Sequence, residues 1–393
     1  MAHATHLTLK AEGAMDSASM RDEGGLSLRS ARRVVLRLRP GVHGGEALSL
    51  GVEVVDFSSN VSPLGPPPRA LRAIKESLNL LNLYPDPQCR AVKEAVAEYL
   101  GSVGPDNVIV GCGSTELIHL FALTFVEEGD EALIPCPTFS EYEVCVAKMG
   151  GLVKPLMLKQ EQGFSLDPEA VLESLSRRTK AIFLCNPNNP TGYLAPREAL
   201  LKIVREAHEA GALVLIDESY VEFVDEPASL VDLVNSYSNL LVLRSITKPF
   251  GMPGLRIGYA VASEEVAGLI SRVKTPWSVS VLAQAAAVEA LRDRRYLERV
   301  KSLVARERRY VYERFRRLRG VWAFPTKANF FLVDVGGTGK TSTTLKADLM
   351  KRGILVRDCS SFRGLGRSYI RVAVRRRLEN EALLRALVAV LGE

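Results

Sequence analysis

Short apolar runs alternate with helical patterns between about residues 105 and 265, and this alternation restricts the possible fold more than any other feature. Helical patterns begin near Ser114, at Asp167 with a proline in the first turn, and near Pro196. Continuous apolar strands separated by helices indicate a mostly parallel sheet that is covered on both faces. We therefore expect an α/β fold here. The apolar runs are VIVGC, EALIPC, AIFLC, LVLID and LLVL.

The C-terminal part of the sequence predicts a second, smaller domain. A long Arg-rich helix closed by Gly320 is followed by NFFLVDV, a helix near 342–352, ILVRDC, YIRVAV and a final helix. This order predicts an α+β unit. The first residues of the chain are polar, Ser-rich and without clear periodicity, which is typical of a mobile extension. The expected division is a mobile N-terminal extension over 1–32, an N-terminal arm over 33–70, a large domain over 71–290 and a small domain over 291–393.

Composition and charge argue against a nucleic-acid-binding or membrane protein. Hydrophobic residues make up 47% and charged residues 24% of the 393, which is ordinary for a soluble globular protein. The net charge of +6 is modest. Apolar residues at helical spacing interrupt the basic run over 292–319, which indicates an amphipathic helix with a solvated Arg/Glu face. We expect no nucleic acid and no membrane as partners.

Cysteine and histidine usage indicates a cytoplasmic protein without a metal site. The six cysteines include no CxxC, and the five histidines show no metal-ligand spacing. There is no secretory signal pattern and no apolar run of about 18 residues. We therefore expect reduced thiols and a cytoplasmic location.

Polar side chains follow four of the apolar runs, at the point where each predicted strand ends. In open α/β sheets ligands bind at the carboxyl ends of the strands. Any one such residue is weak evidence, but four strand ends together favour a binding site. The residues are Gly113, Ser114 and Thr115 after VIVGC, Asn189 after AIFLC, Asp217 and Tyr220 after LVLI, and Ser245 and Lys248 after LLVL.

Lys248 lies in a mostly apolar stretch, where a buried ammonium is costly unless it is paired or loses its charge. One alternative is that its aliphatic stem carries the amine to the surface. The other is that the amine is consumed in a covalent bond to an aldehyde. The neighbouring residues favour the second.

These groups fit pyridoxal 5′-phosphate. Ser114, Thr115 and the free amides at the start of their helix suit a phosphate. Ser245 and Arg256 would add a hydroxyl donor and a fixed positive charge. Lys248 would attach the aldehyde carbon of the cofactor.

The ring of the cofactor would be held by four further side chains. Asp217 would pair with the protonated ring nitrogen. Asn189 and Tyr220 could donate hydrogen bonds to the phenolate oxygen, and Phe139 in PCPTFSEYE would stack on the ring face. Lys248 and Asp217 are therefore the expected catalytic residues.

Five motifs occur in a fixed order: GSTELI, PTFSEYE, CNPNNPTG, DESYVEF and SITKPFGMPGLRIGY. Together they resemble the fold-type I pyridoxal-phosphate enzymes of the class I/II aminotransferase family, over about residues 40–393. The resemblance implies a large domain with a mostly parallel seven-stranded sheet, a small α+β domain built from both termini, and a homodimer with shared active sites. It also implies that Tyr84, in LYPDP, reaches the cofactor phosphate of the partner subunit.

Two subfamilies are similar to this sequence: threonine-phosphate decarboxylases of cobalamin biosynthesis and histidinol-phosphate aminotransferases. VHGGE, DFSSNVSPLGPP, KTPWSVS and RDCSSFRGLGRSYIRVAVR resemble the decarboxylases more closely. Glu46 and Ser62 stand where that pattern usually has Asn, and Pro249 directly follows the lysine. These departures leave the substrate less determined than the cofactor.

Two arginines in apolar strands predict a doubly anionic substrate, because a buried guanidinium requires an anion. The resemblance implies that Arg371 binds a carboxylate. We assign the phosphate to Arg357, His43 and Asn60. An alternative for Arg357 is internal pairing with Asp358, although adjacent strand residues point to opposite faces. The substrate-binding set is thus His43, Gly44, Asn60, Asn189, Arg357 and Arg371.

The resemblance implies decarboxylation of O-phospho-L-threonine to (R)-1-aminopropan-2-ol phosphate, with amino transfer between histidinol phosphate and 2-oxoglutarate as the alternative. The two reactions differ in which Cα bond is held perpendicular to the cofactor ring, and no motif records this. A third possibility is a regulator that binds the cofactor without catalysis. Such a protein needs an output domain, and the sequence contains no pattern for one.

Overall fold

The computed structural model describes residues 30–38, 41 and 44–392 of the chain. Residue contacts divide the chain into two compact units, 1–39 and 40–393. In the first unit the described residues contain one short helix, α3 (Arg33–Arg37). Most of the predicted extension over 1–32 lies outside the described residues. The remaining paragraphs concern the second unit.

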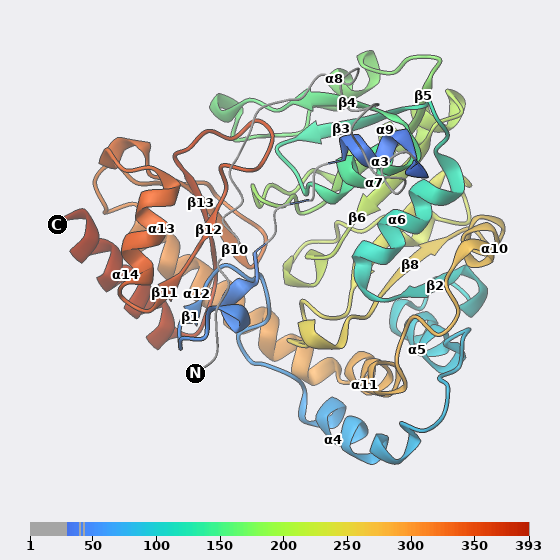
Figure 1. The fold of residues 1–393 in the computed structure, drawn as a ribbon, viewed down its shortest axis with the longest axis horizontal. Coiled ribbons are helices and arrows are strands. Elements are labelled where there is room, and N and C mark those ends of the chain that lie inside the picture. The colour runs from blue at the N-terminus through green and yellow to red at the C-terminus, as the bar shows by residue number, and fades with distance from the viewer. Residues whose placement is uncertain (1–29, 39–40, 42–43, 393) are drawn as a thin grey trace. The chain divides into compact units, whose positions relative to one another are not determined.

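A seven-stranded sheet forms the centre of this unit, in the order β2-β8-β7-β6-β5-β3-β4 (Figure 1). All neighbouring pairs are parallel except those of β8, which runs antiparallel to β2 and to β7. The predicted mostly parallel seven-stranded sheet is therefore confirmed. The strands are β2 (Val108–Gly111), β3 (Glu131–Cys136), β4 (Leu152–Met157), β5 (Thr179–Cys185), β6 (Leu213–Asp217), β7 (Leu240–Ser245) and β8 (Gly258–Ala262).

Both faces of this sheet are buried except at the partly exposed edge strand β4, and alternate residues of the strands contact different hydrophobic clusters. In β6, Val214 and Ile216 join one cluster and Leu215 joins the other. Because both alternating sets of side chains are buried, these strands are continuous apolar runs in the sequence. The first cluster includes residues of α4 (Pro68–Glu76), α5 (Arg90–Leu100), α8 (Pro168–Glu173), α9 (Arg197–Glu209), α11 (Val281–Arg292) and α12 (Arg294–Phe315). The second includes residues of α6 (Gly113–Phe125), α7 (Glu141–Met149) and α10 (Glu264–Val273).

Helix α8 begins as the sequence predicts but ends earlier. The Asp167 side chain accepts a hydrogen bond from Glu169 N, and Pro168 occupies the first turn. We expected the helix to continue to about residue 177, whereas it ends at Glu173. The Ser174 hydroxyl donates a hydrogen bond to Ala170 O at 2.8 Å. This side-chain bond competes with the backbone hydrogen bonds that would continue the helix.

A smaller α+β layer follows the central sheet. Its four-stranded antiparallel sheet has the order β12-β13-β10-β9, and a parallel pair joins β1 to β11. Strand β1 comes from the N-terminal arm, so this layer contains residues from both ends of the unit (Figure 1). Its elements are β1 (Val55–Asp56), β9 (Trp322–Ala323), β10 (Phe330–Asp334), β11 (Ile354–Leu355), β12 (Arg357–Asp358), β13 (Tyr369–Ala373), α13 (Ser342–Met350) and α14 (Arg377–Leu391).

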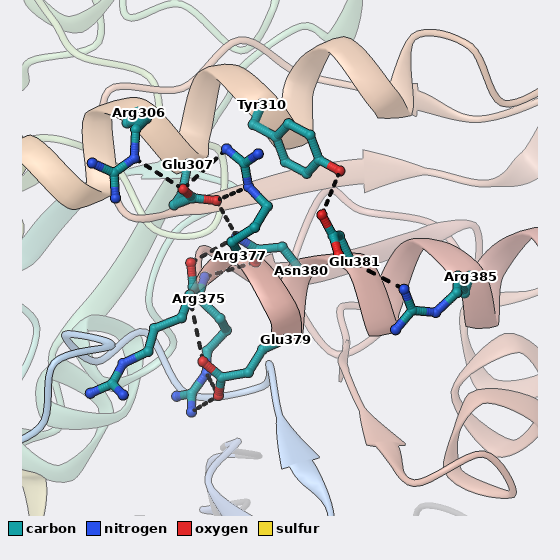
Figure 2. A network of polar contacts seen from close by, with 10 residues as sticks. Arg306, Glu307, Tyr310, Arg375, Arg377, Glu379, Asn380, Glu381 and Arg385 are labelled. Atoms are coloured by element: carbon teal, nitrogen blue, oxygen red, sulfur yellow. Dashed lines mark hydrogen bonds and ion pairs between the residues drawn. The ribbon is translucent and has the colours of Figure 1, made fainter.

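The Arg-rich helix α12 differs from the sequence prediction. It ends at Phe315, before the expected stop at Gly320, and its Arg/Glu face is not fully solvated. Figure 2 shows Glu307 bonded to Arg306 of α12 and to Arg377 and Asn380 of α14. The Glu307 side chain is only 2% exposed. A carboxylate can be buried there because three donors reach it.

Helix α12 also passes from one hydrophobic cluster to another. Val300 and Val304 pack with the central sheet, whereas Val311 and Phe315 pack with the small layer. Because residues 40–393 form one contact unit, the boundary between large and small domains at 290/291 stays a prediction.

None of the helices in the described part of the chain is both long enough and apolar enough to span a membrane.

Candidate active site

A cavity of about 460 Å³ lies at the carboxyl ends of β5, β6 and β7, where the sequence predicts a ligand site. Cys185, Asp217 and Ser245, the last residues of these three strands, all line it. The predicted site residues that line the cavity are Gly44, Asn60, Ser114, Thr115, Phe139, Asn189, Asp217, Tyr220, Ser245, Lys248, Arg256, Arg357 and Arg371.

The N-terminus of α6 forms one end of the cavity. Gly113 has φ +78°, and a Cβ built there would collide with the Arg256 guanidinium. Glycine is therefore required where this guanidinium crosses the first turn. Ser245 Oγ and Thr247 Oγ1 lie 2.9 Å apart at the same end. Free helix amides, hydroxyls and a guanidinium form a suitable phosphate site.

Glu116 shapes this end of the cavity, and the sequence reasoning missed it. Its Oε2 accepts hydrogen bonds from Cys112 N at 2.5 Å and from Ser278 Oγ at 3.1 Å. The carboxylate therefore ties the loop before α6 to the segment that carries Ser278. An acidic residue in the first turn of a helix is a recognised signal that could have indicated this role.

Asp217 lies at the other end, buried and 4% exposed. Tyr142 Oη donates a 2.8 Å hydrogen bond to its Oδ2, and Ser219 N donates a 2.9 Å bond to Oδ1. Burial raises the pKa of Asp217 above its ordinary value, while these two donors and Lys248 act in the opposite direction. The two donors hold the carboxylate oriented in the cavity.

Tyr142 is the second residue that the sequence reasoning missed. It is fully buried, packs edge-on against Phe139 at 5.7 Å and stacks on Phe183. Tyr142 follows Phe139 by three residues, a spacing that brings side chains to the same face of a helical turn. That spacing could have identified Tyr142 as a neighbour of the predicted ring-stacking residue.

Lys248 is partly buried and lines the cavity. Burial lowers its pKa from 10.5 to about 8, with Arg371 and Arg256 adding to the effect and Asp217 opposing it. Its backbone carbonyl accepts a 2.9 Å hydrogen bond from Ser62 N. A lysine with this pKa is partly neutral near pH 8 and so can act as a nucleophile. Its place in the cavity wall argues against the surface alternative.

Arg371 is buried, and its side chain donates hydrogen bonds to two neutral groups. Nη1 donates to Asn189 Oδ1 at 2.5 Å and Nη2 donates to Ser58 O at 2.7 Å. Within the described residues, its Nε has no hydrogen-bond partner. Asn60 Oδ1 is likewise buried without a partner there, while Asn60 Nδ2 donates to Tyr220 Oη at 3.3 Å. Unpartnered buried polar atoms that face a cavity indicate a ligand.

Arg357 lies opposite Arg371 in the β12–β13 pair. Burial lowers its pKa, and the charge of Arg371 lowers it further. A Cβ added to Gly44 would lie 3.4 Å from Arg357 Cδ, so the N-terminal arm packs on the arginine stem.

The alternative pairing of Arg357 with Asp358 receives little support. The Asp358 carboxylate accepts hydrogen bonds from Ser342 Oγ and Thr343 Oγ1 of α13, both at 2.7 Å. These two hydroxyls hold the carboxylate on α13.

Two of the predicted residues that the structure describes do not line the cavity. Gly113 lies directly behind it, under Arg256. Tyr84 is 81% exposed and its ring lies 4.8 Å from that of Trp277, so its predicted role depends on a partner subunit. His43 lies outside the described residues.

Residues 52–390 match the family of class I and II aminotransferases. The chain belongs to this family. It is 40% identical over 333 residues to a histidinol-phosphate aminotransferase of Methanosarcina mazei, covering 85% of this chain and 87% of the relative. It is 39% identical over 353 residues to a protein of Caldanaerobacter subterraneus with the provisional name threonine-phosphate decarboxylase, covering 89% and 94%.

Solved structures of both kinds share the fold. An L-threonine-O-3-phosphate decarboxylase of Porphyromonas gingivalis superposes with a TM-score of 0.77 at 28% identity, covering 86% of this chain and 100% of that one. A histidinol-phosphate aminotransferase of Sinorhizobium meliloti in complex with pyridoxal 5′-phosphate gives a TM-score of 0.83 at 25% identity, covering 92% and 98%. The protein is thus a pyridoxal-phosphate-dependent enzyme of the fold-type I class.

The residues of this cavity fit pyridoxal 5′-phosphate. The helix N-terminus with Ser245 and Arg256 suits its phosphate, the Asp217 carboxylate suits its ring nitrogen, and Lys248 suits its aldehyde. The unpartnered atoms of Asn60 and Arg371 remain for a substrate. These roles are inferred from donor chemistry and position.

Proposed function

We propose that the protein decarboxylates O-phospho-L-threonine, releasing carbon dioxide and leaving (R)-1-aminopropan-2-ol phosphate. The observation that carries the proposal is the placement of Arg357 and Arg371 opposite each other on one cavity wall. The substrate has one carboxylate and one phosphate, and each guanidinium can grip one of them. Gly44 beside Arg357 supports the proposed role of the N-terminal segment at the phosphate.

The side chains divide the work between binding and proton transfer. Bound pyridoxal 5′-phosphate supplies an electron sink for the pair left on Cα when the carboxylate departs. Asp217, held by Tyr142, keeps the proton on the ring nitrogen. Lys248 in its ammonium form, or a nearby water, would then deliver the proton that replaces carbon dioxide on Cα. Arg371 holds the substrate carboxylate until this bond breaks.

The position of the two anion sites would decide which bond breaks. Arg371 is fixed by Asn189 and Ser58, and Arg357 is fixed by Ser361 and Gly44. Two fixed anchors leave a small substrate little freedom to rotate about its Cα–N bond. We infer that the two anchors would hold the substrate so that the carboxylate, and not the Cα hydrogen, is the group lost from Cα.

The alternative function is amino transfer from histidinol phosphate to 2-oxoglutarate. The Methanosarcina mazei relative at 40% identity favours it. Glutamate, with two carboxylates, would also satisfy two arginines. The arginine pair therefore supports the decarboxylase without excluding the aminotransferase.

The deciding experiment uses the purified holoenzyme with O-phospho-L-threonine and no keto acid. Stoichiometric carbon dioxide, with the amine retained in the product, is the expected result. Lys248→Ala is the control and should release none. Background carbon dioxide, together with glutamate formed from histidinol phosphate and 2-oxoglutarate, would make the aminotransferase the correct assignment.

We also propose a homodimer with shared active sites. Several large apolar side chains are exposed around Tyr84, namely Leu78, Leu81, Leu83 and Trp277. An exposed apolar patch of this kind is typical of an interaction surface. Light scattering should give twice the chain mass of 43.0 kDa. From the cysteine usage and the lack of a secretory pattern in the sequence we further propose a cytoplasmic location. The resemblance to the decarboxylases implies a place in cobalamin biosynthesis.

A further inference from the structure

The loop over residues 359–366 is part of the connection between β12 and β13, and its Phe362 lines the cavity as Arg357 does. Ser361 Oγ accepts a 3.0 Å hydrogen bond from Arg357 Nη2. The Arg357 guanidinium carbon lies 5.7 Å from the ring centroid of Phe362, which is buried and lines the cavity. The position of this loop therefore sets the position of the guanidinium.

A bidentate ion pair fixes the loop to α7. Arg363 Nε and Nη2 donate to Oε1 and Oε2 of Glu143, each at 2.8 Å. Two parallel bonds restrict orientation as well as distance, which a single lysine contact would not do. The side chains are 52% and 23% exposed, so the pair lies at the surface.

The loop is also seated closely on the central sheet. Gly364 has φ +87°, and a Cβ there would lie 2.6 Å from Met157 Cε and 3.6 Å from Pro137 N. Glycine is favoured here because its φ is positive, whereas the Met157 contact is with the end of a flexible side chain. The close contact shows that the ion pair holds a packed loop and does not bridge two distant surfaces.

The ion pair connects two walls of the cavity. Glu141 and Tyr142, in the first turn of α7, line the cavity next to Phe139. Glu143 follows directly and contacts the loop that carries Phe362. The wall expected to face the cofactor ring is thus tied to the wall that orients Arg357.

We propose that Arg363 and Glu143 are positioning residues that latch loop 359–366 onto α7 and hold Arg357 where it receives the second anionic group of the substrate. Neither residue lines the cavity. They act through Ser361 and Phe362. The identity of that group as a phosphate rests on the proposed function, whereas the latch requires only that Arg357 binds an anion.

The test compares Glu143→Gln, Arg363→Gln and the charge-reversed double variant Glu143→Arg with Arg363→Glu. Each single variant should raise KM for O-phospho-L-threonine about fivefold, with kcat changed by less than about twofold. In the double variant KM should return most of the way to the wild-type value, because the ion pair is restored with reversed charges.

A matched control exists between α4 and α11. Arg69 and Glu289 form a pair at 2.9 Å with similar exposure, 53% and 27%, and neither lines the cavity. Arg69→Gln should leave KM unchanged. Equal effects at both pairs, or a loss of kcat at constant KM, would overturn the latch.

Hydrogen exchange in the holoenzyme gives a readout that does not depend on activity. The amides of Phe362 and Leu365 are bonded within the loop, to Cys359 O at 3.0 Å and Phe362 O at 3.1 Å. Both should exchange faster in Glu143→Gln and stay as in wild type in Arg69→Gln. Unchanged exchange contradicts the latch.

The two proposals can fail separately. If the wild type acts on histidinol phosphate instead, the KM comparison is made with that substrate, and the decarboxylase assignment fails alone. If the wild type turns over neither substrate, the proposed function fails and the exchange measurement decides the latch.

Discussion

Arg357 and Arg371 lie directly opposite each other across the antiparallel β12–β13 pair, and both line the active-site cavity. Like charges at facing positions of a sheet destabilise it. Burial lowers the pKa of Arg357. The positive charge of Arg371 lowers it further, as expected for two like charges that repel each other. A ligand with two anionic groups would offset the cost, so we interpret the pair as a binding site.

Replacing each arginine should therefore have a different effect. Arg371→Ala should lower kcat/KM for O-phospho-L-threonine, with a loss of transition-state stabilisation of about 2–5 kcal/mol, because it truncates a buried charge-assisted contact. Arg357→Ala should mainly reduce the preference for O-phospho-L-threonine over threonine. Steady-state kinetics with both substrates measure this. Equal losses on both substrates in Arg357→Ala would contradict a phosphate-binding role.

Lys248 should carry the cofactor. Borohydride reduction followed by mass spectrometry should place a phosphopyridoxyl group on Lys248, and a group on another lysine would reject the assignment. With its pKa at about 8, about a quarter of the Lys248 amines are neutral at pH 7.5, against about one in a thousand for an ordinary lysine. Cofactor uptake by the apoprotein should therefore become faster as the pH rises through about 8 and level off about one pH unit above that.

The same shift predicts how the stability of the apoprotein depends on pH. The folded pKa of Lys248 lies below its ordinary value of 10.5, so the unfolded chain binds more protons between about pH 8 and pH 10.5. The contribution of Lys248 to stability therefore rises with pH across this window. Denaturant unfolding of the apoprotein, compared with apo Lys248→Met, isolates the effect. A contribution that falls with rising pH would contradict a lowered pKa of Lys248 in the folded protein.

Much of the fold could be predicted because the sheet is covered on both faces. Strands β5, β6 and β7 are continuous apolar runs, and the residues that end them reach the cavity. Strand β4 was not predicted. It contains Lys154 and Pro155 and is partly exposed at the edge of the sheet, where a proline is tolerated and no apolar run is needed.

The site could be predicted where a side chain carries the chemistry and could not where the backbone or a second contact does. Ser58 contributes a carbonyl oxygen to Arg371, and any residue type could supply one. Tyr142 acts on Asp217, which lines the cavity, and Glu116 acts on Cys112 N at the start of α6. Local spacing could indicate Tyr142 as a neighbour of Phe139 and Glu116 as an acid in the first turn of a helix. Their contacts with Asp217 and Ser278 join residues distant in sequence, so spacing does not predict them.

Tyr142→Phe should shift the acidic limb of the pH–rate profile upward. Burial already raises the pKa of Asp217, and the Tyr142 hydroxyl lowers it. Without that donor the carboxylate is protonated at higher pH, so activity is lost at higher pH. Hydrogen bonds to charged groups contribute about 1.5–3 kcal/mol, which corresponds to a shift of about one pH unit or more. A pH–rate profile with lower rates at every pH but an unshifted acidic limb would indicate a purely structural role for Tyr142.

Glu307→Gln should lower the free energy of unfolding by about 2 kcal/mol, because Glu307 accepts charge-assisted hydrogen bonds in a buried position (Figure 2). Burial alone would raise the pKa of Glu307, but Arg377 and Arg306 hold it below its ordinary value. The stabilisation should therefore decrease as the pH falls through that lowered pKa. Glu381→Gln, which removes a more exposed carboxylate, is the control and should change the free energy of unfolding by less than about 0.5 kcal/mol.

Tyr84 should act on the active site of the partner subunit. It is 81% exposed, which is unusual for a residue with a binding role unless a second chain covers it. Its position is fixed, since its ring packs on Trp277 and Gln284 Nε2 donates a 3.0 Å hydrogen bond to Asp86 O in the same turn. Tyr84→Phe would remove only the hydroxyl expected to reach the cofactor phosphate.

Mixed dimers provide the test. Tyr84→Phe and Lys248→Ala homodimers should each be impaired at every site. After subunit exchange, a mixed dimer has one site with both changes and one site with neither, so activity should recover. Since mixing at equal amounts makes half of all dimers mixed, recovery should approach about a quarter of wild-type activity if each site works independently. Exchange is verified by native mass spectrometry of differently tagged chains. No recovery after verified exchange would mean that Tyr84 serves its own subunit or no active site at all.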